Sequence, residues 1–208
     1  MASKVFPVIC GVLAASSFST AWADYSYIQV NSSSDEALDS TANGLCTLRE
    51  AVGMFNKTNK TTNTDCTKVV VISSGWHPNE IRIPYTLMAP SIPTLSLSAS
   101  LGAIDVSPDE PLHIRGSTYI DTNGNLQQSQ ATIVRPALES DAVTYTNLTD
   151  AIFNISSVGA SVPIEISHFS LWRGRGVDGG AIKTTQTLTL NSVEIRDTIA
   201  SGSGAAIY

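Results

Sequence analysis

The chain has 208 residues, of which 42% are hydrophobic and 14% are charged. The charged share is low against the roughly 25% usual in globular proteins, and the abundant Ser, Thr and Asn mixed with Val and Ile favour strands and turns. The 18 acidic and 12 basic residues give a net charge of −6, which offers no electrostatic case for nucleic-acid binding. The recurring Leu, Ile and Val argue against a disordered chain.

Residues 1–23 have the pattern of an export signal. Lys4 precedes a largely apolar run from Val5 to Phe18, and Ala21-Trp22-Ala23 supplies the small-x-small cleavage motif. The apolar run is shorter than the roughly 20 residues that span a bilayer. We therefore expect cleavage after residue 23 and a secreted or cell-surface protein with no transmembrane segment once the signal is removed.

Export determines how the cysteines are interpreted. Cys10 leaves with the signal, so the mature chain keeps Cys46 and Cys66. In an oxidising compartment such a pair favours a bridge over two free thiols, and two cysteines without a nearby histidine do not complete a zinc site. We predict a Cys46–Cys66 disulfide and no metal there.

A short helix is predicted directly after Cys46. Thr47 and Glu50 have the spacing of a capping box, in which Thr47 is the N-cap and Glu50 reaches back to its amide. The apolar residues that follow share one helical face, and so short a helix needs that face to cover a core. This apolar face of the cap consists of Leu48, Ala51, Val52 and Phe55.

A resemblance to a known family lies in the hexapeptide Cys46-Thr47-Leu48-Arg49-Glu50-Ala51, which is similar to the hallmark of the CSLREA domain with Thr at its second position. The flanks agree, because a strand-like segment at 27–30, an acidic stretch and Gly44 precede it and a second cysteine follows. The resemblance implies an exported bacterial protein that opens a right-handed parallel β-helix, similar to polymorphic outer-membrane and adhesin-type proteins.

A repeat farther along the chain favours the same fold. Ile164-Glu165-Ile166 recurs 24 residues later as Leu188-Thr189-Leu190, and one additional residue brings Gly179 onto Gly204. A period in the low twenties is typical of a solenoid whose turns stack on one another, and the apolar–polar alternation turns every second side chain inward.

These patterns together predict an all-β fold, a right-handed parallel β-helix (solenoid) with a short N-terminal capping α-helix. The expected division is a signal peptide at 1–23, a CSLREA-type cap at 24–80 and β-helix rungs at 81–208. Because nothing near Tyr208 resembles a polar C-terminal cap, we expect a truncated chain or the first part of a longer protein. Self-association through the uncapped last rung is the other expectation.

Two motifs resemble ligand sites but are interpreted as turns. The sequence 174–179 matches G-x-G-x-x-G, yet a turn and a strand-like run follow it where a nucleotide site needs a helix. The sequence 121–125 has alternating oxygen ligands, but it lacks the turn glycine and bidentate Glu of a calcium loop. The acidic residues before the helix are interpreted as solvated loop charges, which would bind calcium only if the fold brought them together; they are Asp35, Glu36 and Asp39.

Catalysis has weak support in the sequence. The β-helix fold also carries enzymes that cleave acidic polysaccharides, with paired carboxylates as acid and base or with a calcium–arginine arrangement. No second carboxylate stands beside Asp178 or Asp197, and His77, His113 and His168 are far apart in sequence. We therefore predict no catalytic residue, no metal and no cofactor apart from a weak calcium alternative. The residues weighed for catalysis are His168, Arg173, Arg175, Asp178, Arg196 and Asp197.

The resulting expectation is an exported structural or adhesive protein that is non-catalytic in this segment. Its partners would be glycans or molecules of a host or neighbouring cell, and no nucleic acid. The alternative is the N-terminal fragment of a secreted polysaccharide lyase or hydrolase.

Overall fold

The structure is a computed structural model. It describes residues 24–38, 42–58, 61, 65–73, 75, 77–87, 92–117, 119–120, 126–127, 132–137, 147–156 and 161–208. The predicted signal peptide and its cleavage site at 1–23 lie outside the described residues, so both stay predictions.

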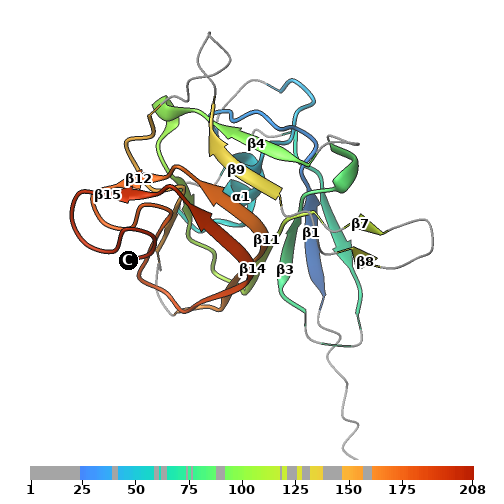
Figure 1. The fold of residues 1–208 in the computed structure, drawn as a ribbon. Helices are drawn as coiled ribbons and strands as arrows, with labels where there is room; N and C mark the ends of the chain where they lie inside the picture. The colour runs from blue at the N-terminus through green and yellow to red at the C-terminus, as the bar shows by residue number, and fades with distance from the viewer. Residues whose placement is uncertain are drawn as a thin grey trace, which may run out of the picture.

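The main sheet contains eight strands: β1 (Tyr25–Gln29), β2 (Lys68–Val71), β3 (Asn79–Arg82), β4 (Thr94–Leu97), β6 (Leu112–Arg115), β9 (Thr132–Pro136), β11 (Ile164–Trp172) and β14 (Leu188–Arg196). Their order is β2-β1-β3-β6-β11-β9-β4, and β14 pairs with the other edge of β11. Neighbours are parallel except for β1 and β2. Figure 1 shows β14 beside β11, and β1 beside β3.

Smaller sheets and short helices complete the fold. A three-stranded parallel sheet has the order β13-β10-β5, and two further pairs of short strands stand apart from it. Parallel pairing joins β12 to β15, whereas β7 and β8 are antiparallel. The bounds are β5 (Ile104–Val106), β7 (Tyr119–Ile120), β8 (Leu126–Gln127), β10 (Phe153–Ile155), β12 (Arg175–Gly176), β13 (Ile182–Thr184), β15 (Ile199–Ala200), and the 3-10 helices η1 (Tyr85–Leu87) and η2 (Ala99–Leu101).

The predicted all-β, right-handed parallel β-helix is wrong. The fold is mostly β, but its main sheet mixes parallel and antiparallel strands, and no closed or solenoid sheet occurs among the described residues. One edge of β11 pairs with β6 through Ile164–Ser167 and with β9 through Phe169–Leu171, so two strands share it end to end. The expectation failed because the 24-residue spacing relates β11 to β14, whereas much longer and irregular segments separate β3, β6 and β11.

The alignment between the two repeat copies is confirmed as strand register. Ile164 lies opposite Leu188 and Phe169 opposite Val193 in the parallel β11–β14 pair. The bends match as well, because His168 and Ser192 have φ of 60° and 55°. The predicted Gly179 and Gly204 equivalence holds too, with φ of 70° and 65° at these turns. Residues in this left-handed region turn the chain at the same place in both copies.

The core lies behind the main sheet and is built from inward-facing isoleucines. Ile28, Ile81, Ile114 and Ile166 are neighbours across β1, β3, β6 and β11, and all four are fully buried. Alternation along each strand places the residues between them on the opposite, outward side. A core side chain from the three-stranded sheet, Phe153, meets Phe169 edge to face with ring centroids 6.5 Å apart.

The predicted helix is confirmed as α1 (Leu48–Phe55). The Thr47 hydroxyl accepts from the Glu50 amide, and Glu50 Oε2 accepts from the Thr47 amide at 3.0 Å, which completes the capping box. All four residues of the predicted apolar face are buried, and α1 packs against β5. No helix in the described part of the chain is long and apolar enough to cross a membrane.

Candidate functional site

The outward side of the main sheet carries polar side chains in register. The first row runs across β1, β3, β6 and β11 and contains Tyr27, Glu80, His113 and Glu165. The second row lies two residues farther along the same strands. It contains Gln29, Arg82, Arg115 and Ser167. We call these eight residues the polar face.

Glu80 is the charged centre of the polar face. It is 8% exposed, and its Oε2 accepts from Arg82 Nε at 2.7 Å. Its Oε1 lies 3.5 Å from Nη1 of Arg115. Burial lowers the pKa of Arg82, but hydrogen bonds and charge interactions with Glu80 and Tyr25 outweigh it, so the pKa is raised overall. The guanidinium of Arg82 also stacks on the Tyr27 ring, with Cζ 4.1 Å from the centroid.

A neutral imidazole stands beside these charges. His113 Nε2 is 2.7 Å from Ser167 Oγ and 3.8 Å from Glu165 Oε1. Burial lowers the pKa of His113 and outweighs the opposing effect of Glu165. Burial, followed by the charge of Arg115, also lowers the pKa of His168, whose Nδ1 is buried without a hydrogen-bond partner among the described residues. Both rings are therefore poised to stay neutral near pH 7.

A pocket of about 260 Å³ opens on the polar face, over its β3 and β6 residues. The Tyr25 and His77 rings form part of its wall, with centroids 5.0 Å apart. Guanidinium, imidazole, carboxylate and aromatic groups thus converge on one small volume, which combines hydrogen-bond donors and acceptors suited to a polar ligand. The lining residues are Tyr25, His77, Pro78, Glu80, Arg82, His113 and Arg115.

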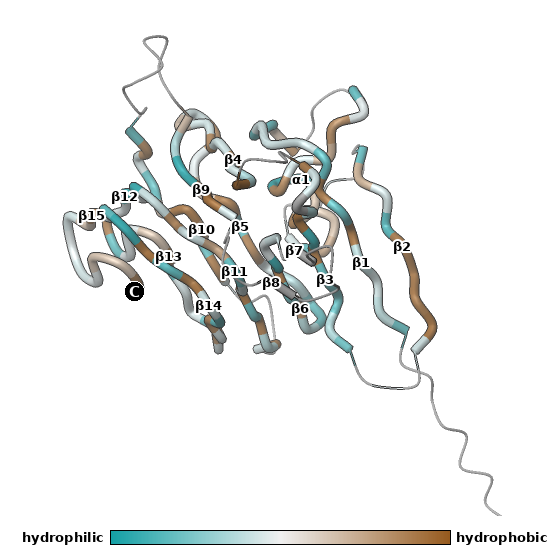
Figure 2. Tube along the Cα trace, turned by 45° about the vertical axis from the view of Figure 1, so that its right-hand side comes forward, coloured by the Kyte–Doolittle hydropathy of each residue, from teal (hydrophilic) through white to brown (hydrophobic). Residues whose placement is uncertain are grey.

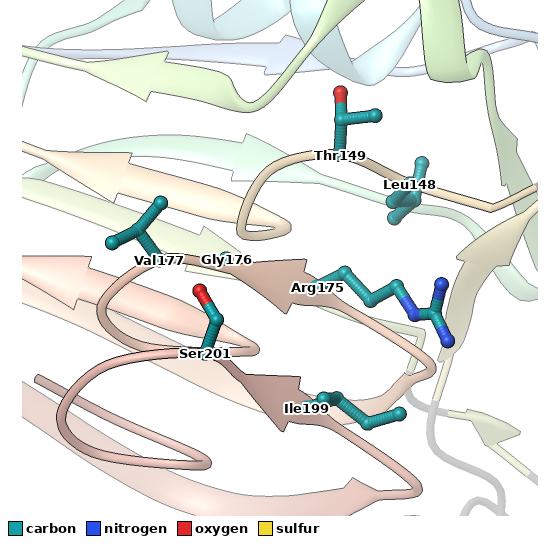
Figure 3. Close-up of a pocket in the computed structure, with 7 residues that line it drawn as sticks. All are labelled: Leu148, Thr149, Arg175, Gly176, Val177, Ile199 and Ser201. Carbon is teal, nitrogen blue, oxygen red and sulfur yellow. The ribbon is translucent and has the colours of Figure 1, made fainter.

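A second hollow of about 360 Å³ lies over β12 and β15. Figure 3 shows Val177 and Ser201 on the turns after these strands, below and to the left of Thr149, whereas the Arg175 side chain extends to the right-hand side of the view. The lining is mainly aliphatic and hydroxylic, with no carboxylate or imidazole, so it offers little for acid–base chemistry. It consists of Leu148, Thr149, Arg175, Gly176, Val177, Ile199 and Ser201.

The site residues predicted from the sequence build the cap and do not line either hollow. Cys46 and Cys66 form the expected disulfide, with their Cα atoms 4.6 Å apart. Thr47 and Glu50 are fully buried at the start of α1. The capping box and the disulfide therefore stabilise the start of α1, and their side chains do not line either of the two hollows.

The interpretation of the acidic stretch as solvated is wrong for Asp35. Its side chain is 3% exposed and pairs with Arg49 of α1 at 2.8 Å. Glu36 is held by a hydrogen bond from Asn43 Nδ2 at 2.8 Å, whereas Asp39 and the turn at 121–125 lie outside the described residues. Among the described residues, no group of three or more His, Cys, Asp or Glu side chains is arranged to hold a metal ion.

The residues weighed for catalysis are dispersed over the fold. Asp178 accepts from the Ser203 amide at 3.1 Å, and Arg196 pairs with Glu194 at 2.5 Å on β14. Arg173 and Asp197 occupy equivalent left-handed bends. Arg175 lies in the second hollow, whereas His168 interacts electrostatically with Arg115 and His113 of the polar face. The G-x-G-x-x-G match forms β12 and a turn, and strand β13 follows it, which confirms the turn interpretation.

The polar face was not predicted from the sequence. The histidines that are far apart along the chain converge, because His77 and His113 line one pocket and His168 lies near the same charges. The available signal was the matching pattern of Asn-Glu-Ile-Arg at 79–82 and Leu-His-Ile-Arg at 112–115, each with polar residues at alternate positions.

No protein-family model, curated protein or solved structure matches the chain. Its function therefore has to be argued from the residues and their geometry.

Proposed function

We propose that this is an exported, surface-exposed scaffold that binds acidic glycans through the polar face. The observation that carries the proposal is the cross-strand alignment of Glu80, Arg82, His113 and Arg115 around the pocket of about 260 Å³. A rigid sheet fixes the spacing of these groups, so a ligand meets a prearranged set of donors.

The chemistry of the pocket indicates the ligand class. Guanidinium groups bind carboxylates and sulfates through paired hydrogen bonds, and aromatic walls pack against the apolar faces of sugar rings. The side chains of Arg82 and Arg115 are 37% and 35% exposed, so both reach solvent beside the buried Glu80. The signal-like N-terminus and the resemblance of the α1 segment to the CSLREA hallmark support display outside the cell.

Binding to immobilised polysaccharides tests the proposal. We expect uronate-containing or sulfated polymers to retain the protein and neutral polymers to release it. Arg115→Gln should weaken binding at least about tenfold, since it removes a charge-assisted contact of roughly 1.5–3 kcal/mol. Lys183→Gln, on the separate three-stranded sheet, is the matched control and should bind normally. Equal binding by both variants, or retention on neutral polymers alone, would contradict the proposal.

A second candidate function is cleavage of such a polymer by β-elimination, and the lowered pKa of His113 favours it. A neutral imidazole would take the proton next to the uronate carboxylate while a guanidinium stabilises the developing charge. The carbon–oxygen bond to the leaving sugar then breaks as a carbon–carbon double bond forms, and the departing oxygen takes up a proton from the imidazolium or from water. Ultraviolet absorbance of the unsaturated product decides between the two functions: binding without absorbance supports the scaffold, and absorbance that is lost in His113→Gln supports the enzyme.

A further inference from the structure

A partly exposed tryptophan stands on the outward side of the main sheet, on the second half of β11. Trp172 has a strand on either side, since it lies opposite Arg196 of β14 and β9 pairs with the other edge of β11. The β9 register sets Leu171 opposite Val134, so the next pair is Trp172 and Arg135. Figure 2 shows β6 and β9 at different heights beside β11, as this pairing requires. We call one line of residues across β4, β9, β11 and β14 the tryptophan row: Ser96, Arg135, Trp172 and Arg196.

A bend in β11 puts this row on the same side of the sheet as the polar face. Glu165 points outward before the bend, and strict alternation from there would turn Trp172 inward. His168, with φ of 60°, resets the alternation, so that Phe169 and Leu171 are the buried residues of the second half. The tryptophan row and the polar face therefore lie on one outward surface, roughly 20 Å apart along β11 at about 3.3 Å per residue.

The indole of Trp172 is held in place by a circuit of polar contacts. Its Nε1 donates to Ser170 Oγ at 2.9 Å, and that hydroxyl donates to Glu194 Oε2 at 2.8 Å. Glu194 pairs with Arg196, whose Cζ lies 5.5 Å from the centroid of the indole. Hydrogen bonds from Arg196 and Ser170 lower the pKa of Glu194, which keeps it a carboxylate. The ring is thus a prearranged surface whose own N–H is already satisfied.

The charge of this region complements the charge of the polar face. In the polar face two arginines and two glutamates cancel, and the imidazole of His113 is neutral. Around Trp172, Arg135 and Arg196 face one carboxylate, that of Glu194, which leaves one positive charge. An acidic polymer that crosses both regions therefore meets net positive charge on a chain whose overall charge is −6.

We propose that the tryptophan row is a second subsite for the acidic glycan, in which a sugar ring stacks on Trp172 while Arg135 and Arg196 bind its carboxylate or sulfate groups. This inference rests on the proposed glycan-binding function. An indole presents a flat apolar surface to the C–H face of a sugar, and guanidinium groups bind such anions through paired hydrogen bonds. Because one rigid sheet carries both subsites, an oligomer that spans them gains a second contact at high effective concentration, whereas a short one fills the polar face alone.

The test measures the affinity of the purified chain for size-graded oligomers of galacturonate and of a sulfated glycosaminoglycan by titration calorimetry. Oligomers that span both subsites should bind at least about tenfold more tightly than short ones. Trp172→Ala and Arg135→Gln should remove this gain and leave the binding of short oligomers unchanged. Arg115→Gln should weaken the binding of both. Arg175→Gln is the matched control, because this exposed arginine lies on β12 outside the main sheet, and it should bind like the unmodified protein.

The outcomes separate the subsite from the function on which it rests. If Arg115→Gln weakens binding but Trp172→Ala and Arg135→Gln keep the full gain with length, the subsite is overturned and the glycan-binding function stands. Equal losses for short and long oligomers in Trp172→Ala also overturn the subsite, since they report a change in the polar face. Arg135→Gln carries the test if melting shows Trp172→Ala to be unfolded. Absence of binding, or binding that Arg115→Gln leaves unchanged, overturns both proposals.

Discussion

Arg49 and Asp35 form a buried, two-pronged ion pair, with Nε and Nη2 of Arg49 at 2.8 and 2.9 Å from the two carboxylate oxygens. Nη1 and Nη2 of Arg49 also donate to the carbonyls of Ala103 and Gly102, at 2.6 and 2.8 Å. Asp35 also accepts from the Ser98 amide at 3.0 Å. One pair therefore holds α1, the loop before it and the segment that leads into β5.

Replacing Arg49 with Met should lower the free energy of unfolding by about 3–5 kcal/mol, because it leaves the Asp35 carboxylate buried without its cation. Urea denaturation measures the loss. Adding Asp35→Leu to Arg49→Met should restore part of it by removing the stranded charge. Arg196→Met, in the exposed pair with Glu194, is the control and should leave the denaturation midpoint unchanged. Equal losses in the two single variants would refute a special role for the buried pair.

Leu48→Ala should destabilise the protein by about 2–5 kcal/mol, since this side chain is 3% exposed under α1 and its truncation leaves a cavity. Leu45→Ala makes the same chemical change three residues earlier, where the side chain is 40% exposed. Thermal denaturation should show a clear drop for the first variant and little change for the second. Similar melting temperatures for both would mean that α1 does not close the core.

Reduction of the Cys46–Cys66 bridge should cost about 3 kcal/mol, as expected when a cross-link with a sequence separation of 20 is released in the unfolded chain. Melting with and without reductant measures the effect. A variant with both cysteines changed to Ser should melt like the reduced protein and should be insensitive to reductant. A reductant effect that persists in that variant would have to arise elsewhere.

Stability should fall as the pH is lowered below about 6.5, the ordinary pKa of histidine. The pKa values of His113 and His168 are lowered in the folded protein, so the unfolded chain binds more protons between those values and 6.5. The stability that these two neutral rings contribute is fully present above about pH 6.5. It is lost as the pH falls from there through the lower pKa values of the folded protein. Urea midpoints in a pH series should drop less in His113→Gln/His168→Asn, whereas the exposed-residue control His77→Gln should keep the full slope.

Ser192 lies at a bend in the left-handed region, with φ of 55°. Glycine should therefore be more stable than a residue with a side chain at this position, the reverse of the order expected in an extended strand. Ser192→Gly should stabilise by up to about 1 kcal/mol and Ser192→Val should destabilise by a similar amount, because a branched side chain is strained there. At Thr189, exposed in the extended part of β14, the same two substitutions should rank in the opposite order. Thermal melts of all four variants provide the comparison, and a common ranking at both positions would rule out backbone strain as the cause.

The local features of the cap could be predicted because their signals are short-range. The capping box, the apolar face of α1 and the disulfide each depend on residues within one turn or on a pair of cysteines in one compartment. The register of β11 with β14 was also predictable, since two nearly equal copies such as Ile164–Ile166 and Leu188–Leu190 lie next to each other in the chain.

The sheet and its polar face were not predictable for a different reason. Tyr27, Glu80, His113 and Glu165 come from strands separated by irregular segments, and only long-range pairing sets them in one row. The β-helix prediction extended the repeat formed by β11 and β14 to the whole chain. In the structure, β2 runs antiparallel to β1, and the 24-residue spacing between β11 and β14 does not continue to the strands before β11. Asp35 was misjudged because the sequence does not show that Arg49 lies within reach.

The double pairing of β11 has a consequence for the order of folding. Without β11, the other strands of the series belong to two separate pieces of sheet, β2-β1-β3-β6 and β9-β4. One strand joins them, through its first half to β6 and through its second half to β9. Until β11 has paired with both, each piece keeps an edge of unpaired backbone groups, and this is the interval of folding in which binding by a chaperone protects the chain most.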